Sequence, residues 1–152
     1  MPSLGARILG ILLYMIPWSD SLTFGNHLYI KYPFTQIIQV PAIPILLIER
    51  LIPFGSLLLF LAIFLGLVRN SKVPYFLRFN ALQSLLINIG IIIVNFIFEI
   101  IFSPFFNSLI IRTFSSTLLI SIFSVIVFCI WCCTKGNEPD LPGISQATKM
   151  QL

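Results

Sequence analysis

The chain has 152 residues, of which 58% are hydrophobic and only 9% carry a charge. An average soluble domain has about a quarter of its residues charged, and a soluble fold of this size leaves roughly a third of its potential surface in water. The composition therefore excludes an ordinary soluble domain and predicts a protein of the lipid bilayer. The net charge of +4 is too thinly spread to indicate nucleic-acid binding. It suits orientation in a membrane and contact with anionic headgroups.

The first apolar run predicts the least certain membrane span. Residues 4–18 form 15 positions, about 22 Å of helix, whereas the hydrocarbon core of a bilayer is about 30 Å thick. The run therefore either spans a locally thinned bilayer or continues as irregular structure that its neighbours bury. No cleavage site and no transit-peptide pattern accompany it, so we expect the segment to be retained.

Prolines divide the next part of the chain into short pieces. Those between residues 33 and 44 exclude one long helix. The apolar run 43–52 is short and contains an acidic and a basic residue, which predicts a short interfacial helix. A second span is expected over residues 51–68, with Pro53 at its first helical position, where the missing N–H costs nothing.

The clearest span covers residues 81–102, and a last span is expected over residues 113–133 after a turn at Asn107-Ser108. Residues 136–152 form a polar C-terminal tail with a short helix near its end. The sequence thus predicts an all-α, polytopic membrane helical bundle. Four transmembrane helices and one short interfacial helix form a single membrane domain, residues 1–135, and the tail follows it.

Two of these spans carry a polar stripe on one face. In the third span the stripe consists of Asn80, Ser84, Asn88, Asn95 and Glu99, within about a 100° sector of the helix. In the last span, hydroxyls recur at helical spacing at Thr113, Thr117, Ser121 and Ser124. An unpaired amide in hydrocarbon costs several kcal/mol, so the asparagines must face protein or water.

Two interpretations of the stripe on the third span stay open. Asn88 and Asn95 either hydrogen-bond the hydroxyl stripe and hold the bundle together, or they line a hydrated path for an extended polypeptide or an ion. Ser84 and Glu99 belong to the same candidate wall. Glu99 lies near the end of its helix, where it reaches the membrane interface, pairs within the bundle or marks a path.

A densely charged loop, VRNSKVPYFLRFNALQ over residues 68–83, lies between two apolar runs. With four spans, this loop, Arg7, Lys135 and the tail share one side and carry six Lys and Arg residues. The opposite side carries three, namely Lys31, Arg50 and Arg112. Both termini are therefore expected to face the compartment in which the chain is made.

Four residues of this loop have two interpretations. Arg69, Asn70, Arg78 and Asn80 either set topology and cap helices, with Asn80 as the N-cap of the third span, or they form a docking surface for a soluble partner. The choice between them decides whether the loop has a role beyond orientation.

The sequence contains no recognisable catalytic or metal-binding set. His27, the only histidine, has no cysteine or carboxylate at a ligand-like spacing, and neither a glycine-rich phosphate loop nor HExxH is present. Cys129, Cys132 and Cys133 are interpreted as small apolar residues at a helix end, with palmitoylation as the alternative. We expect neither an enzyme nor a bound metal or cofactor.

The charged loop resembles the signature of the Tic-twenty family, the four-span subunit of the protein-import translocon in the chloroplast inner envelope. The family pattern is VRN followed by F-x-RFN-x-x-Q. The matching residues are Val68, Arg69, Asn70, Phe76, Arg78, Phe79, Asn80 and Gln83. Residues 12–25, 33–54 and 141–152 resemble further family segments, so the resemblance covers nearly the whole chain. It looks like the plastid-encoded type, ycf-sixty, or a cyanobacterial relative.

This resemblance implies four spans, both termini on the stromal side, and preprotein translocation together with other inner-envelope translocon subunits. In a cyanobacterium the membrane would be the plasma or thylakoid membrane. Two alternatives are a non-conducting scaffold or assembly subunit and a small transporter or ion channel. A bundle of this size has little room for a pore of its own. A path is therefore expected at an interface with another subunit or with a second copy in a homo-oligomer.

Overall fold

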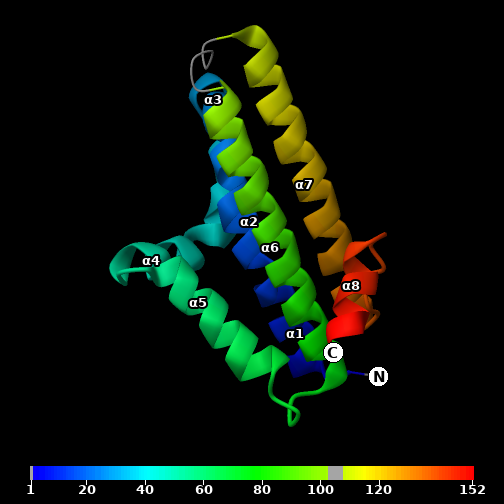
Figure 1. Ribbon diagram of the computed structural model, residues 1–152. Coiled ribbons are helices and arrows are strands. Elements are labelled where there is room, and N and C mark those ends of the chain that lie inside the picture. The colour runs from blue at the N-terminus through cyan, green and yellow to red at the C-terminus, as the bar shows by residue number, and fades with distance from the viewer. Residues whose placement is uncertain (1, 103–107) are drawn as a thin grey trace.

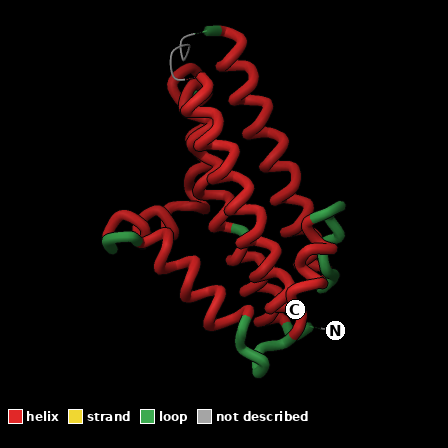
Figure 2. Tube along the Cα trace, in the orientation of Figure 1, coloured by secondary structure: helices red, strands yellow, loops and turns green. Residues whose placement is uncertain are grey.

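The computed structural model describes residues 2–102 and 108–152, and every regular element in these ranges is helical (Figure 1, Figure 2). Four helical stretches are long and apolar enough to cross a membrane, namely Leu4–Lys31, Pro33–Leu51, Tyr75–Phe102 and Leu109–Lys135. The expected all-α membrane bundle is therefore confirmed. Part of the turn expected at Asn107-Ser108 lies outside the described residues.

The first pass, residues 4–31, is helical well beyond the run 4–18 expected from its apolar residues. It consists of α1 (Leu4–Leu13), α2 (Met15–Ser21), the 3-10 turn η1 (Leu22–Gly25) and α3 (Asn26–Lys31). Pro17 lies in the first turn of α2, where a missing N–H is tolerated. The polar residues that follow remain helical because their hydroxyls are satisfied locally: Ser19 donates to the Ile16 carbonyl and Ser21 to that of Trp18.

The second pass, residues 33–68, is broken into pieces that change direction. It contains η2 (Pro33–Ala42), α4 (Ile43–Leu51), α5 (Gly55–Ile63) and the π-helical turn η3 (Phe64–Val68). In Figure 1, η2 descends beside the first pass, α4 projects sideways at about mid-height, and α5 runs down to the end that holds the termini. The short helix expected at 43–52 is present, whereas its interfacial position stays a prediction.

The expected helix 51–68 is reduced to the shorter apolar helix Gly55–Val68, because Pro53 lies in the turn between α4 and α5 rather than at a helix start. The expectation that prolines exclude one long helix before it is wrong, since Pro33–Leu51 is helical throughout and long enough to cross a membrane. Phe54 adopts a left-handed conformation with φ 58°. A Cβ on Gly55 would lie 2.7 Å from the Glu49 Cα and 2.8 Å from the Glu49 carbonyl oxygen. Only glycine therefore fits the elbow between α4 and α5 without moving backbone.

The third and fourth passes are single long helices, α6 (Tyr75–Phe102) and α7 (Leu109–Lys135), and α8 (Ile144–Gln151) follows in the tail. Helix α6 begins at Tyr75 rather than at residue 81, because Pro74 provides the first carbonyl and accepts from the Leu77 and Arg78 N–H groups. Both termini and the loop 69–74 lie at one end of the bundle, as Figure 1 shows.

The core lies along the first pass, which contacts both α6 and α7. Tyr14, Phe79, Leu85 and Ile126 are its largest apolar or aromatic side chains that are almost wholly buried. Higher in the bundle the Trp18 ring packs edge-on against Phe123, with 4.6 Å between centroids, and the indole N–H donates to the Ile38 carbonyl in η2. The outer faces of the long helices are mostly apolar and exposed, as a bilayer requires.

Replacement of Gly55 by alanine is expected to destabilise the elbow, because the new methyl group would collide with the Glu49 backbone. We expect a loss of about 1–3 kcal/mol in the free energy of unfolding, measured by denaturant titration of the detergent-purified chain. Gly66→Ala is the matched control, since no atom outside its own helix backbone and chain neighbours lies within 4 Å of its Cβ position. Equal stability of the two variants would contradict the elbow.

Candidate functional site

Asn80, a residue of the RFN motif, lies at a buried junction of three helices. Its Oδ1 accepts a hydrogen bond of 3.0 Å from the hydroxyl of Tyr14, which lies between α1 and α2, and one of 3.1 Å from the Cys133 thiol of α7. Its Nδ2 donates to the Phe76 carbonyl at 2.8 Å. Asn80 is fully buried in the interior of α6, so the expectation that it is an N-cap is wrong. Its amide joins the first, third and fourth passes.

Gln83, one turn further along α6, holds the C-terminal tail. Its Nε2 donates to the Pro139 carbonyl at 3.2 Å and to the Ser145 hydroxyl at 3.4 Å. Ser145 in turn donates to Pro139 and accepts from the Leu141 N–H. The tail was expected as a polar appendage, yet Gln83, Ser145 and Thr148 are all buried where it packs on α6.

Arg78 connects the second pass to the tail. Its Nε donates to the Val68 carbonyl at the end of η3, at 3.0 Å, and its Nη2 contacts the Leu152 carbonyl at 3.5 Å. A guanidinium at the carbonyl end of a helix is also electrostatically favourable. Together Arg78, Asn80 and Gln83 form what we call the motif hub, which joins all four passes and the tail.

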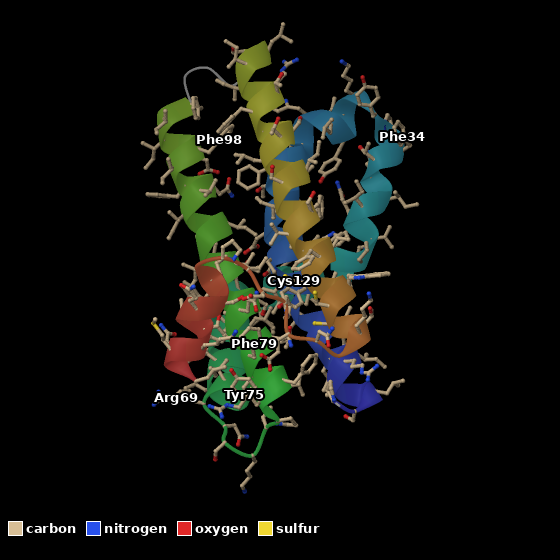
Figure 3. All side chains as sticks on the ribbon, turned by 90° about the vertical axis from the view of Figure 1, so that its right-hand side faces the viewer. Phe34, Arg69, Tyr75, Phe79, Phe98 and Cys129 are labelled. Carbon is tan, nitrogen blue, oxygen red and sulfur yellow. The ribbon has the colours of Figure 1, made fainter. Side chains whose placement is uncertain are left out.

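The other motif residues divide by exposure. Phe76 and Phe79 are buried, whereas Arg69 and Asn70 are exposed in the loop at the lower end of the bundle. Figure 3 shows Phe79 inside the bundle and Arg69 at its lower edge. Of the residues proposed as a docking surface, only these two remain accessible, together with the neighbouring Lys72.

The three cysteines also differ in accessibility. Cys129 and Cys133 are fully buried, and Cys132 is half-buried. Attachment of a lipid would therefore be open only to Cys132. In the part of the chain that the structure describes, no group of three His, Cys, Asp or Glu side chains is placed to hold a metal ion.

The polar stripe of α6 continues from the motif hub but does not meet the hydroxyls of α7. Ser84 is buried and donates to the Ala81 carbonyl of its own helix. Asn88 is buried beside the Asp20 carboxyl. The Asn95 amide donates to the Thr23 hydroxyl at 3.3 Å, and Glu99 is exposed. Both asparagines thus face the first pass.

The hydroxyl stripe of α7 is satisfied within its own helix. Thr113, Thr117, Ser121 and Ser124 are exposed, and each donates to the carbonyl four residues earlier, at 2.8–2.9 Å. Among the described residues, the two polar stripes therefore do not hydrogen-bond each other, contrary to the first interpretation of the stripe on α6. The physical reason is that α2 packs against both α6 and α7 and separates the two faces.

A cavity of about 340 Å³ opens where α5 diverges from α6. Its polar lining residues are Asp20, Thr23, Ser56, Asn95 and Glu99, from the first, second and third passes. We call it the polar cavity. Helix α5 approaches α6 closely through η3 and then leaves it, as Figure 1 shows, so the cavity faces outward between passes.

The polar cavity combines hydrogen-bond donors and acceptors with two carboxylates at an outward face of a membrane bundle. This arrangement suits binding of a polar or cationic group, rather than covalent chemistry. Asn95 and Glu99 were expected to belong to one wall. Sequence reasoning missed Asp20, Thr23 and Ser56. Asp20 lies just beyond the apolar run 4–18, so a prediction that this run continues as helix would have placed it inside the bundle.

Replacement of Gln83 by leucine is expected to loosen the tail, because the leucine cannot donate to Pro139 or Ser145. A hydrogen bond of this kind contributes about 1 kcal/mol, so we expect trypsin to cleave after Lys149 about fivefold faster. Mass spectrometry of timed digests in detergent measures the rate. Gln146→Leu makes the same exchange on the exposed face of α8. An equal effect there would argue against a specific role of the Gln83 hydrogen bonds.

The chain is similar to proteins of one family over nearly its whole length. Residues 1–148 match the family model described as "Chloroplast import apparatus Tic20-like". A "Tic20 family protein" from Synechocystis is 31% identical over 147 residues, covering 96% of this chain and 92% of that protein. A "Tic20 family protein Ycf60" from Gracilaria tenuistipitata is 30% identical over 152 residues, covering 96% and 74%.

A land-plant relative matches over a shorter region. "Protein TIC 20-II, chloroplastic" from Arabidopsis thaliana is 34% identical over 83 residues, which is 55% of this chain and 40% of that protein. The family model spans nearly the whole chain, including the motif hub, the polar cavity and most of the tail. The chain therefore belongs to the Tic20 family.

Proposed function

We propose that this chain is a membrane subunit of the protein-import translocon of the chloroplast inner envelope and that its polar cavity forms one wall of the preprotein path. Relatives are named as chloroplastic and cyanobacterial Tic20-type proteins, which supports a plastid or cyanobacterial membrane. The inner envelope and the import role extend that family-level statement to this chain. The observation that carries the proposal is the outward-facing cavity with polar groups from three passes.

The chemistry of the polar cavity fits an unfolded preprotein. An extended polypeptide carries unpaired N–H and C=O groups, which cannot enter hydrocarbon without partners. Asn95 and Ser56 offer donors and acceptors to such a backbone, and Thr23, whose hydroxyl donates to the Asp20 carbonyl, offers an acceptor. Asp20 and Glu99 add negative charge, and chloroplast transit peptides are rich in arginine and poor in acidic residues.

The shape of the bundle supports a path shared with another protein. The polar cavity lies at an outward face rather than along the bundle axis, so a second wall must come from another translocon subunit or from a second copy. We also propose that both termini face the stroma. The loop 69–74 lies at their end of the bundle, and together they contain more Lys and Arg than the opposite end.

A photoreactive amino acid at position 95 tests the path directly. While a precursor is arrested during import, we expect crosslinks from residue 95 to the precursor, because Asn95 lines the polar cavity. Position 93 is the control, since the Ile93 side chain is 52% exposed on the outer face and is absent from the cavity lining. Crosslinks from residue 95 only to neighbouring membrane subunits would overturn the path and favour packing.

A second candidate function, a scaffold that docks other subunits, is favoured by the exposed basic residues of the loop 69–74. Arg69 and Lys72 are free to meet an acidic partner, whereas Arg78 is engaged with Val68 and Leu152. Charge reversal of Arg69 and Lys72 is then expected to remove the chain from its complex on native gels.

Charge reversal at Lys149, which is exposed on α8 at the same end, is the control for that loop test. If the doubly reversed loop variant still assembles fully, the scaffold function is excluded. Loss of assembly in both variants would indicate a general need for positive charge at this end, and not docking by the loop.

A further inference from the structure

Another cavity with polar groups lies at the end of the bundle away from both termini, between α3 and the start of α7. Its volume is about 740 Å³. His27 and Lys31 of α3 and Arg112 of α7 line it, and we call it the basic cavity. None of the described residues in its lining is acidic, and the segment 103–107, which precedes α7, contains no charged residue. It shares no lining residue with the polar cavity.

The charges of the basic cavity are at odds with the signal that orients the chain. The end that carries the termini is rich in Lys and Arg, and the opposite end normally carries few. Lys31 and Arg112, which approach from two different passes, nevertheless line one cavity at that opposite end. Like charges in one cavity repel each other, whereas an anion between them makes both interactions favourable.

Helix ends of both signs lie at the basic cavity. Helix α7 begins at Leu109, and Ser108 at its N-cap makes no side-chain hydrogen bond to it. The N-terminal end of a helix carries a partial positive charge that favours anions. Leu109 and Arg112, both in the first turn, line the cavity. The carbonyl end of α3, at Lys31, lies at the same cavity and opposes this dipole, so the positive potential comes chiefly from the basic side chains.

Apolar side chains lead from the basic cavity to the outer surface of the bundle. Leu28, Ile30 and Leu109 line the cavity beside the charges. Ile30 is 82% exposed and Leu109 is 78% exposed, so their outer faces need hydrocarbon. Tyr32 lines the cavity, and Phe34 follows it in the chain near the same end, as Figure 3 shows. Aromatic residues of this kind mark the level of the headgroups.

We infer that the basic cavity binds an anionic lipid, with a phosphate or sulfonate headgroup between Lys31 and Arg112 and its acyl chains along Ile30 and Leu109. His27 supplies a further ring nitrogen to the headgroup. A soluble anion would use the charges but not the apolar exit, and a zwitterionic lipid would use the exit but gain little from the charges. An anionic lipid uses both.

Native mass spectrometry of the full chain, purified in detergent, tests this inference. The chain is titrated with phosphatidylglycerol, with phosphatidylcholine and with glycerol 3-phosphate as the free headgroup. The double variant Lys31→Gln with Arg112→Gln removes two charges from the basic cavity. The matched control, Arg69→Gln with Lys72→Gln, removes two exposed charges at the other end. Thermal unfolding without lipid confirms that both variants fold.

We expect the cavity variant to bind phosphatidylglycerol about 30-fold more weakly, since each basic residue near an anionic headgroup contributes roughly a fivefold gain. Phosphatidylcholine binding should not change, and the control variant should match the unaltered chain. The variant Arg112→Lys, which keeps the charge, should retain most of the preference.

Three results would overturn the inference. If the cavity variant keeps its preference for phosphatidylglycerol, the lipid is bound elsewhere. If both double variants lose it equally, the preference reflects net charge and not a site. If glycerol 3-phosphate competes as well as the intact lipid, the cavity is a site for soluble anions.

Discussion

The fold depends on satisfying one buried amide. Asn80 has no access to solvent, and an unpaired amide in such surroundings costs several kcal/mol. Its partners come from the junction of α1 and α2, from α7 and from its own helix. The three helices must therefore reach the same place in the same register, which apolar packing in lipid does not enforce, since lipid tails are as apolar as the side chains. Gln83 and Arg78 extend the same constraint to the tail and the second pass.

Because the motif hub secures one end of the bundle, the rest of the second pass is free to diverge. Helix α5 is held at its end by Arg78 and by the contact of η3 with α6. At its other end the elbow at Gly55 turns the chain into α4, away from α6. The polar cavity opens between these two points. One end of the bundle is thus held by the hydrogen bonds of the motif hub, whereas the divergence of α5 from α6 forms the polar cavity.

Much of the fold was predictable because hydropathy and proline position are local properties. Helix α6, helix α7, the short helix at 43–51 and the helix in the tail all follow from apolar runs and their breaks. The continuation of the first pass to Lys31 was not predictable, because Ser19 and Ser21 count as polar in a sequence yet bond to carbonyls of their own helix. Whether a serine ends an apolar run depends on partners that hydropathy does not record.

The site was predictable only in part, for a related reason. Asn95 and Glu99 follow from helical spacing within one span. Asp20, Thr23 and Ser56 come from other passes, and their approach depends on the angle of α5 and the length of the first pass. The roles of Arg78, Asn80 and Gln83 also require knowledge of which helices are neighbours. A motif in a sequence shows that these residues act together but not whether they face a partner or the core.

The hydrogen bonds between Gln83 and the tail have a consequence for biosynthesis. Gln83 and Ser145 are 62 residues apart in the chain. At about 5–20 residues per second, the ribosome makes Ser145 roughly 3–12 s after Gln83. During that interval α6 exists with a polar side chain whose final partners have not been made, and water or the insertion machinery must solvate it. The packing around Gln83 is therefore completed late, when α8 docks on α6. A nascent chain stalled before the tail would lack the partners of Gln83 at the motif hub.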